Sequence, residues 1–256
     1  MGDAMDRRPE ITIVDDAEAL AETAARAIVD IATEAVRARR RFTVALAGGS
    51  TPRATYERLA RAPLRERMPW DATWVFFGDE RGVPPDHPDS NYRMASAALL
   101  SKVPIPAGQI ARIRGEADDP DAAAAEYGRI VAEVFGSRRG ELPSFDLILL
   151  GMGIDGHTAS LFPGSPVLKE VFRPVAAVHA AAAMIPQRFT FTFPLINAAA
   201  RVMFLVSGRE KAKAVRTVLG EPGSGLPASM VQPVSGRLTW LLDRAAAALL
   251  SPEKGR

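Results

Sequence analysis

The sequence contains no cysteine. This absence excludes disulfide bonds, thiolate zinc sites and a cysteine nucleophile, and it leaves the redox compartment of the protein open. The G-x-S-x-G elbow that presents the nucleophilic serine of many hydrolases is missing as well. If the protein is a hydrolase, we therefore expect water to be the nucleophile.

An excess of one charge is also lacking. The 32 basic residues nearly balance the 30 acidic ones, which leaves a formal net charge of +2. Nucleic-acid-binding domains usually concentrate basic residues on one face, so nucleic acid is not an expected partner. We interpret the arginine-rich stretches 37–41 and 58–67 as solvated helix ends.

Long apolar runs are absent too. No window approaches 18 uninterrupted apolar residues, and the first ten residues, MGDAMDRRPE, contain no apolar signal-peptide core. We expect no export, no membrane partner and a cytoplasmic location. The length of 256 residues suits one large α/β domain or two small ones, and no repeat or long linker divides the chain.

Two segments have the spacing of amphipathic helices. Residues 119–135 form one, with Asp119 as the N-cap and Pro120 as the first helical residue. In residues 15–40, Asp15 and Glu18 make a variant of the capping box. The apolar positions of that helix follow at steps of three or four, at Leu20, Ala24, Ile28, Ile31 and Ala35.

Short apolar runs at residues 41–46, 73–77, 145–150 and 201–206 predict buried strands. Glycine-rich or polar loops follow them, and helices follow the loops, starting at Pro52, near Asn91 and close to Lys211. This alternation predicts an α/β fold with a mainly parallel, Rossmann-like sheet covered by helices on both faces. Ligands of such folds bind beyond the carboxyl ends of the strands.

Residues 187–193, QRFTFTF, alternate in polarity like a strand. We expect Phe189, Phe191 and Phe193 on a buried face. Arg188, Thr190 and Thr192 are expected on an exposed or pocket-facing side.

The loop LAGGSTP, residues 46–52, places Gly48, Gly49, Ser50 and Thr51 between a strand and a helix. Backbone N–H groups at a helix N-terminus attract anions, and glycine lets an anion approach closely, so the loop can bind a phosphate. An ordinary turn capped by Ser50 or Thr51 is the alternative. The lysine of a nucleotide P-loop and the third glycine of a dinucleotide loop are missing, which favours a small phosphorylated metabolite.

A second loop, FFGDERGVPPDHPDSNY, places Asp79, Glu80 and Arg81 directly after a strand. Arginine pairs well with phosphate, and a carboxylate orients it or moves protons. Arg188 and Lys211 are further cations on elements that reach the same edge. Together these cations supply enough positive charge for one phosphate.

The third loop lies in LILLGMGIDGHTASLFPG, residues 147–164. Gly151, Gly153 and Gly156 allow a sharp turn, and Asp155 and His157 stand two residues apart within it. Histidine is the usual general base near neutral pH. With one histidine, one aspartate and no neighbouring cysteine or second histidine, no metal is expected, although a weak hard-ion site through Asp155 stays open.

Taken in order, these loops resemble the 6-phosphogluconolactonase family, which is related to the glucosamine-6-phosphate isomerases and deaminases. The matching stretches are LAGGSTP, FFGDERGVPPDHPDSNY, DLILLGMGIDGHTASLFPG, PQRFTFTFPLIN, VSGREKA and GRLTWLLDRAAA. The resemblance implies a single domain over residues 1–256 that hydrolyses 6-phospho-D-glucono-1,5-lactone to 6-phosphogluconate in the oxidative pentose phosphate pathway. It implies no cofactor, and we expect a monomer or a weak homodimer.

Two other functions stay open on the same scaffold. In the deaminases, the stretch that corresponds to GIDGHTASLFPG resembles GIDGHIAFNEPG, with a glutamate soon after the histidine. The deaminases also carry MDEY where this chain has GDER. Here no carboxylate follows His157 until Glu170, and both differences favour the lactonase. The other alternative is a sugar-phosphate sensor that has kept the binding site and lost the chemistry.

The resemblance and the chemistry together assign the roles. His157 is the general base, Asp155 orients the pocket or holds substrate hydroxyls, and amides of Gly151, Gly153 and Gly156 stabilise the oxyanion. Asp79 orients Arg81 or the sugar. The phosphate is expected at Gly48, Gly49, Ser50, Thr51, Arg81, Arg188 and Lys211.

Overall fold

Six parallel strands form the central sheet, in the order β1-β9-β8-β5-β2-β3. The computed structural model describes residues 9–138, 140–181, 183–221 and 223–250. The strands are β1 (Glu10–Val14), β2 (Phe42–Leu46), β3 (Thr73–Phe77), β5 (Leu147–Leu150), β8 (Arg201–Val206) and β9 (Arg237–Asp243). The predicted parallel α/β sheet is confirmed.

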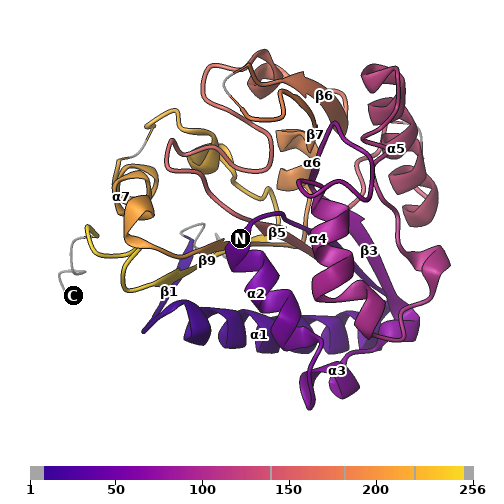
Figure 1. The fold of residues 1–256 in the computed structure, drawn as a ribbon, viewed down its shortest axis with the longest axis horizontal. Coiled ribbons are helices and arrows are strands. Elements are labelled where there is room, and N and C mark those ends of the chain that lie inside the picture. Colours follow the sequence, from indigo (N-terminus) through magenta and orange to yellow (C-terminus); the bar gives the residue numbers. More distant parts are fainter. Residues whose placement is uncertain (1–8, 139, 182, 222, 251–256) are drawn as a thin grey trace, which may run out of the picture.

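Helices cover both faces of this sheet. Helix α1 runs along one face, and a second layer that includes α5, α6 and α7 lies on the other (Figure 1). The helices are α1 (Ala17–Arg39), α2 (Ser50–Leu59), α3 (Leu64–Arg67), α4 (Asn91–Ala98), α5 (Pro120–Phe135), α6 (Phe193–Asn197) and α7 (Ala212–Gly220). Short 3₁₀ turns are η1 (Trp70–Ala72), η2 (Leu100–Lys102), η3 (Ala107–Gln109), η4 (Pro166–Lys169), η5 (Arg209–Lys211) and η6 (Pro227–Met230).

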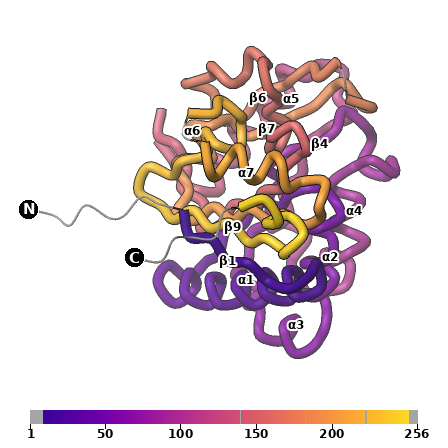
Figure 2. The backbone as a smooth tube through the Cα atoms, turned by 90° about the vertical axis from the view of Figure 1, so that its left-hand side faces the viewer, coloured from indigo at the N-terminus to yellow at the C-terminus, as the bar shows by residue number. Residues whose placement is uncertain are grey.

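A three-stranded antiparallel sheet belongs to the second layer (Figure 2). Its order is β4 (Asp79–Arg81), β7 (Gln187–Phe191), β6 (Val175–His179). Phe145 joins this layer to the central sheet, since its ring centroid lies 5.1 Å from that of Phe76 and 5.4 Å from that of Phe191. At the carboxyl end of β3, Phe191 N donates to Gly78 O at 2.7 Å, which holds the second sheet next to that end of the strand.

The structure corrects the expected environment of residues 187–193. Thr190 and Thr192 are fully buried, because β7 is the middle strand of its sheet and loop residues cover it: Thr190 Oγ1 accepts a hydrogen bond of 3.2 Å from Ser160 N. Phe193 begins α6 and is not part of the strand. Arg188 alone of the three polar residues faces the pocket.

The start of α1 is also corrected. Asp16 is the N-cap, and its side chain accepts a 2.9 Å hydrogen bond from Ala19 N. Asp15 instead pairs with Arg244 at 2.7 Å. The cap of α5 is confirmed, with Asp119 accepting from Ala122 N at 3.0 Å and Pro120 following it. Within the described residues, no helix is long and apolar enough to span a membrane.

Two buried tyrosines fix the chain where it leaves β2 and β3. The Tyr56 hydroxyl accepts from Ala47 N and donates to Ala47 O, both at 2.9 Å. The Tyr127 hydroxyl accepts from Phe77 N at 2.8 Å and donates to Ala111 O at 3.1 Å. Burial raises the pKa of both phenols, so both stay protonated. Each hydroxyl therefore replaces hydrogen bonds that a strand would have supplied.

We predict that Tyr56→Phe lowers the free energy of unfolding by about 1–3 kcal/mol, because it leaves the buried N–H and C=O of Ala47 without their partner. Urea unfolding measures this loss. Tyr92→Phe is the control, since Tyr92 contributes mainly its ring, whose centroid is 5.8 Å from that of Phe77. Equal losses in the two variants would contradict the assignment.

Candidate active site

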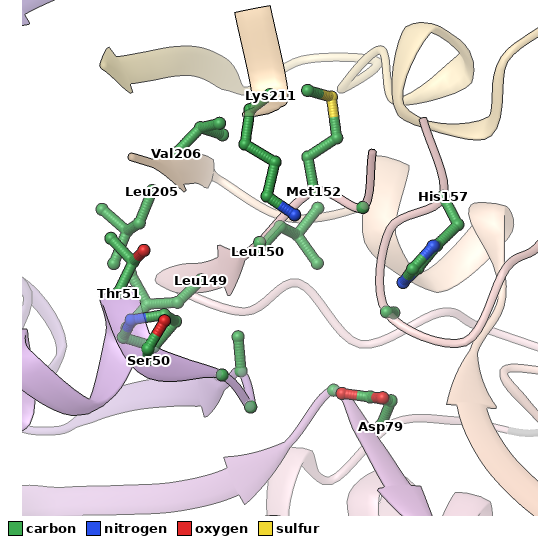
Figure 3. A pocket seen from close by; sticks show the side chains of 18 of the residues that line it. Ser50, Thr51, Asp79, Leu149, Leu150, Met152, His157, Leu205, Val206 and Lys211 are labelled. Carbon is green, nitrogen blue, oxygen red and sulfur yellow. The ribbon is translucent and has the colours of Figure 1, made fainter. Parts of the chain in front are cut away.

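The carboxyl ends of β2, β3, β5 and β8 open into a cavity of about 290 Å³ (Figure 3). The loops that leave these strands form its walls, and Arg188 of β7 completes them. Figure 3 shows the Lys211 ammonium, the His157 imidazole and the Asp79 carboxylate extending into the same space from three different elements. The predicted residues that line it are Gly48, Gly49, Ser50, Thr51, Asp79, Arg81, Gly151, Gly153, His157, Arg188 and Lys211.

One wall is the N-terminus of α2. The helix begins at Ser50, two residues before the predicted start, and Gly49 precedes it with φ = +103°. In the described chain no side chain caps this helix, so the alternative of a turn capped by Ser50 or Thr51 is wrong. The uncapped amides and the helix dipole give this wall a positive potential.

Gly48 is required by close packing rather than by backbone conformation. A Cβ atom at this position would lie 2.0 Å from Asn91 Oδ1. The Asn91 side chain also donates to the carbonyl oxygen of Asp79 at 3.0 Å and to Asp79 Oδ1 at 3.1 Å. Asn91 thus joins the first two predicted loops.

Arg81 and Arg188 are paired across β4 and β7. Arg81 Nη1 donates to Asp89 O at 2.5 Å, and Arg188 Nε donates to Ile185 O at 2.7 Å. Arg81 Nε is buried without a hydrogen-bond partner among the described residues. Burial, and next the charge of Arg81, lower the pKa of Arg188 from its ordinary value. Two neighbouring guanidinium groups repel each other, and an anion between them relieves that repulsion.

Asp79 lies in the cavity wall and is almost fully buried. Its Oδ2 accepts from Ser160 Oγ at 2.9 Å, and Oδ1 accepts from Asn91. Arg81 is not one of these partners, so within the described residues no hydrogen bond supports the predicted orientation of Arg81 by Asp79. A fixed carboxylate in this position is suited to accept sugar hydroxyls.

The adjacent carboxylate, Glu80, has a different surrounding. It accepts hydrogen bonds from the N–H groups of Arg81, Asn91 and Tyr92 at 2.7, 2.7 and 2.8 Å. Burial raises its pKa, although these hydrogen bonds oppose the shift. Glu80 therefore holds the start of α4 and the loop before it, outside the cavity lining.

A tight turn carries the histidine. Gly153 N donates to His157 O at 2.8 Å, and Gly156 N donates to Gly153 O at 3.1 Å. Gly156 has φ = +79°, and a Cβ at Gly153 would lie 2.1 Å from His157 Nδ1. Both glycines are needed to close the turn. The amides of Gly153 and Gly156 donate to carbonyl groups within the turn. Of the three predicted oxyanion donors, only the Gly151 amide is not used by this turn.

Asp155 and His157 form a pair. Asp155 Oδ1 lies 2.6 Å from His157 Nδ1 and also accepts from His157 N at 3.2 Å. Partial burial raises the pKa of Asp155, but the hydrogen bonds and charge of His157 outweigh it and hold the pKa below its ordinary value. Because Asp155 is ionised, the proton of a neutral imidazole belongs on Nδ1, which leaves Nε2 as the base. The Phe162 ring packs against the imidazole, with centroids 4.5 Å apart.

The last wall is the turn after β8. Gly208 N donates to Asp243 Oδ2 at 3.1 Å, and Ser207 Oγ donates to the same oxygen. Asp243 is buried at the end of β9. It therefore fixes the turn that leads into η5 and brings Lys211 to the cavity.

Of the predicted site residues, Asp155 and Gly156 are not among the described residues that line the cavity; both belong to the turn that carries His157. Sequence reasoning did not single out Asn91, Ser160, Glu210 or Asp243. All four lie inside stretches quoted for the family resemblance, which was a usable signal. Among the described residues, no group of three or more His, Asp or Glu side chains is placed to hold a metal.

Comparisons with known proteins identify the family of the chain. Residues 15–240 match the family described as glucosamine-6-phosphate isomerases/6-phosphogluconolactonase. The chain is 41% identical to a 6-phosphogluconolactonase of Nostoc sp., over 94% of this chain and 98% of that protein. It is 42% identical to a probable chloroplastic 6-phosphogluconolactonase of Oryza sativa subsp. indica, over 94% and 76% of the two chains. A solved 6-phosphogluconolactonase from Trypanosoma cruzi superposes with a TM-score of 0.86 at 31% identity, over 97% and 99%.

Proposed function

The chain belongs to the glucosamine-6-phosphate isomerase/6-phosphogluconolactonase family, and we propose that it hydrolyses 6-phospho-D-glucono-1,5-lactone to 6-phospho-D-gluconate, in the oxidative pentose phosphate pathway. Its relatives named above make it a hydrolase of the 6-phosphogluconolactonase type. The observation that carries the proposal is the Asp155–His157 pair, whose histidine lines a cavity together with Arg81, Arg188 and Lys211.

Water is the nucleophile in this proposal. His157 Nε2 takes a proton from the water as its oxygen bonds to C1 of the lactone. Asp155 keeps the ring in the required tautomer and stabilises the imidazolium that forms. When the tetrahedral intermediate collapses, the bond between C1 and the ring oxygen breaks, and the imidazolium returns its proton to that oxygen. Atoms and charges balance without a cofactor.

The phosphate supplies the binding energy that places C1 near His157. We assign it to the uncapped N-terminus of α2 at Ser50 and Thr51 and to the cations Arg81, Arg188 and Lys211. Remote binding energy of this kind is used to orient the reacting carbon. Asp79 is proposed to accept sugar hydroxyls, and Gly151 to donate to the oxyanion.

The position of Glu170 argues against amino-sugar chemistry. It is the first carboxylate after His157 in the sequence. Its oxygens accept from Phe172 N at 2.8 Å and from Arg173 N at 3.0 Å, and these bonds hold its pKa at about 2. Glu170 is thus engaged in hydrogen bonds within residues 170–173. Within the described chain, the carboxylate that pairs with the proposed base is Asp155.

Purified protein is expected to hydrolyse freshly generated 6-phosphogluconolactone in a coupled assay, well above the rate without enzyme. The comparison is necessary because the lactone also hydrolyses spontaneously. A parallel assay with glucosamine 6-phosphate is expected to release no ammonia. Ammonia release would favour the deaminase, and binding of 6-phosphogluconate without lactone turnover would favour the sensor.

A further inference from the structure

The segment after α7 packs against the histidine turn from outside the cavity. If Gly156 carried a Cβ, that atom would lie 2.8 Å from Leu226 Cδ1, 3.0 Å from its Cβ and 3.2 Å from its Cγ. The Leu226 side chain therefore fills the space directly over Gly156. On the same side, Ala228 N donates to Gly156 O at 3.0 Å. Two contacts thus fix the residue that stands between Asp155 and His157.

The supporting segment is itself well fixed. Ser229 donates to Leu226 O through its N–H at 2.9 Å and through its hydroxyl at 2.7 Å. Pro227 and Ala228 are buried in η6. A support that is anchored in this way can transmit its position to the turn that it touches.

The turn needs an outside support because much of it lies in solvent. Ile154 is 67% exposed, and the Asp155 side chain is 47% exposed. On its inner side the turn faces the cavity, which has to admit the substrate. Packing on Gly156 therefore helps to decide where the imidazole lies.

From these contacts we infer that Leu226 is a positioning residue for the Asp155–His157 pair. Leu226 is not itself among the residues of the described chain that line the cavity. It acts through Gly156, by preventing the turn from moving outward. The effect on catalysis rests on the proposed lactonase function, whereas the effect on the histidine ring does not.

Leu226→Ala is expected to lower kcat for the lactone about 10- to 100-fold, since a displacement of the order of 1 Å at a catalytic group has this scale of effect. KM is expected to change little, because the substitution leaves the residues proposed to bind the phosphate unchanged. Leu226→Met, which conserves volume, is expected to restore most of the activity. Leu238→Ala is the matched control, a partly buried leucine near the amino end of β9, away from the carboxyl ends of the strands where the cavity lies.

A kcat loss no larger in Leu226→Ala than in Leu238→Ala would overturn the inference, as would a failure of Leu226→Met to recover activity. Circular dichroism and thermal unfolding establish that each variant is folded. If Leu226→Ala does not fold, Leu226→Val replaces it, because it removes less volume. Its loss of kcat is then compared with that of Leu238→Ala in the same way.

A second measurement is independent of turnover. Nitrogen-15 NMR of the imidazole ring is expected to show the Nδ1-protonated tautomer of His157 in the wild type and a mixture of tautomers in Leu226→Ala. Identical ring signals in the two proteins would overturn the positioning role. If the wild type does not hydrolyse the lactone, the proposed function fails while the NMR result still decides the role of Leu226.

Discussion

Replacing His157 with alanine is expected to lower kcat for 6-phosphogluconolactone by about 10²-fold or more, the usual contribution of an acid–base group. The Nε2 atom would no longer take the proton of the attacking water, and Asp155 would lose the ring that it holds at 2.6 Å. Binding of the product should persist, because the cationic walls stay in place. Initial rates, corrected for spontaneous hydrolysis, measure the loss.

His179→Ala is the control for this variant. His179 is an exposed histidine at the end of β6 and should tolerate the change with normal turnover. If His157→Ala were folded and kept a near-normal kcat, His157 would be removed from the chemistry.

Arg188→Ala is expected to lower kcat/KM for the phosphorylated lactone by about 10- to 100-fold, the value of a hydrogen bond or two to a charged group. The unphosphorylated gluconolactone should lose far less, because it has no phosphate for the guanidinium to bind. Steady-state kinetics with both substrates separate the two effects.

Arg209→Ala removes an equal charge close to Lys211, from a residue that is exposed. Little change is expected for either substrate. If Arg188→Ala weakened both lactones equally, the phosphate would have to be bound elsewhere in the cavity.

The four strands predicted from apolar runs, β2, β3, β5 and β8, are buried along almost their whole length. Apolar runs such as β2 and β5 carry their own signal, because both faces of a parallel sheet are covered. β1 was missed because it is an edge strand with a mostly exposed pattern. β4 was missed because its three residues are all charged and become a strand only by pairing with β7. No local propensity encodes such a pairing.

The loops of the site were predictable for a topological reason, since the carboxyl ends of parallel strands converge on one edge. The contacts that position their side chains were not. Ser160 reaches Asp79 across 81 positions of sequence, and Asp243 reaches Ser207 across 36. Leu226 opposes Gly156 from the glycine- and proline-containing stretch GEPGSGLPAS, which has no apolar periodicity of its own. These residues become recognisable once the tertiary structure brings them together.

The separation of the two ends of the cavity also bears on how such a site can change over evolution. The groups proposed for the phosphate come from α2, η5 and the second sheet, whereas the proposed base stands on the turn after β5. Under the proposed roles, substitutions in that turn would change the reacting groups and leave Ser50, Thr51, Arg188 and Lys211 as they are. A family whose description names both isomerases and a lactonase is consistent with such a division.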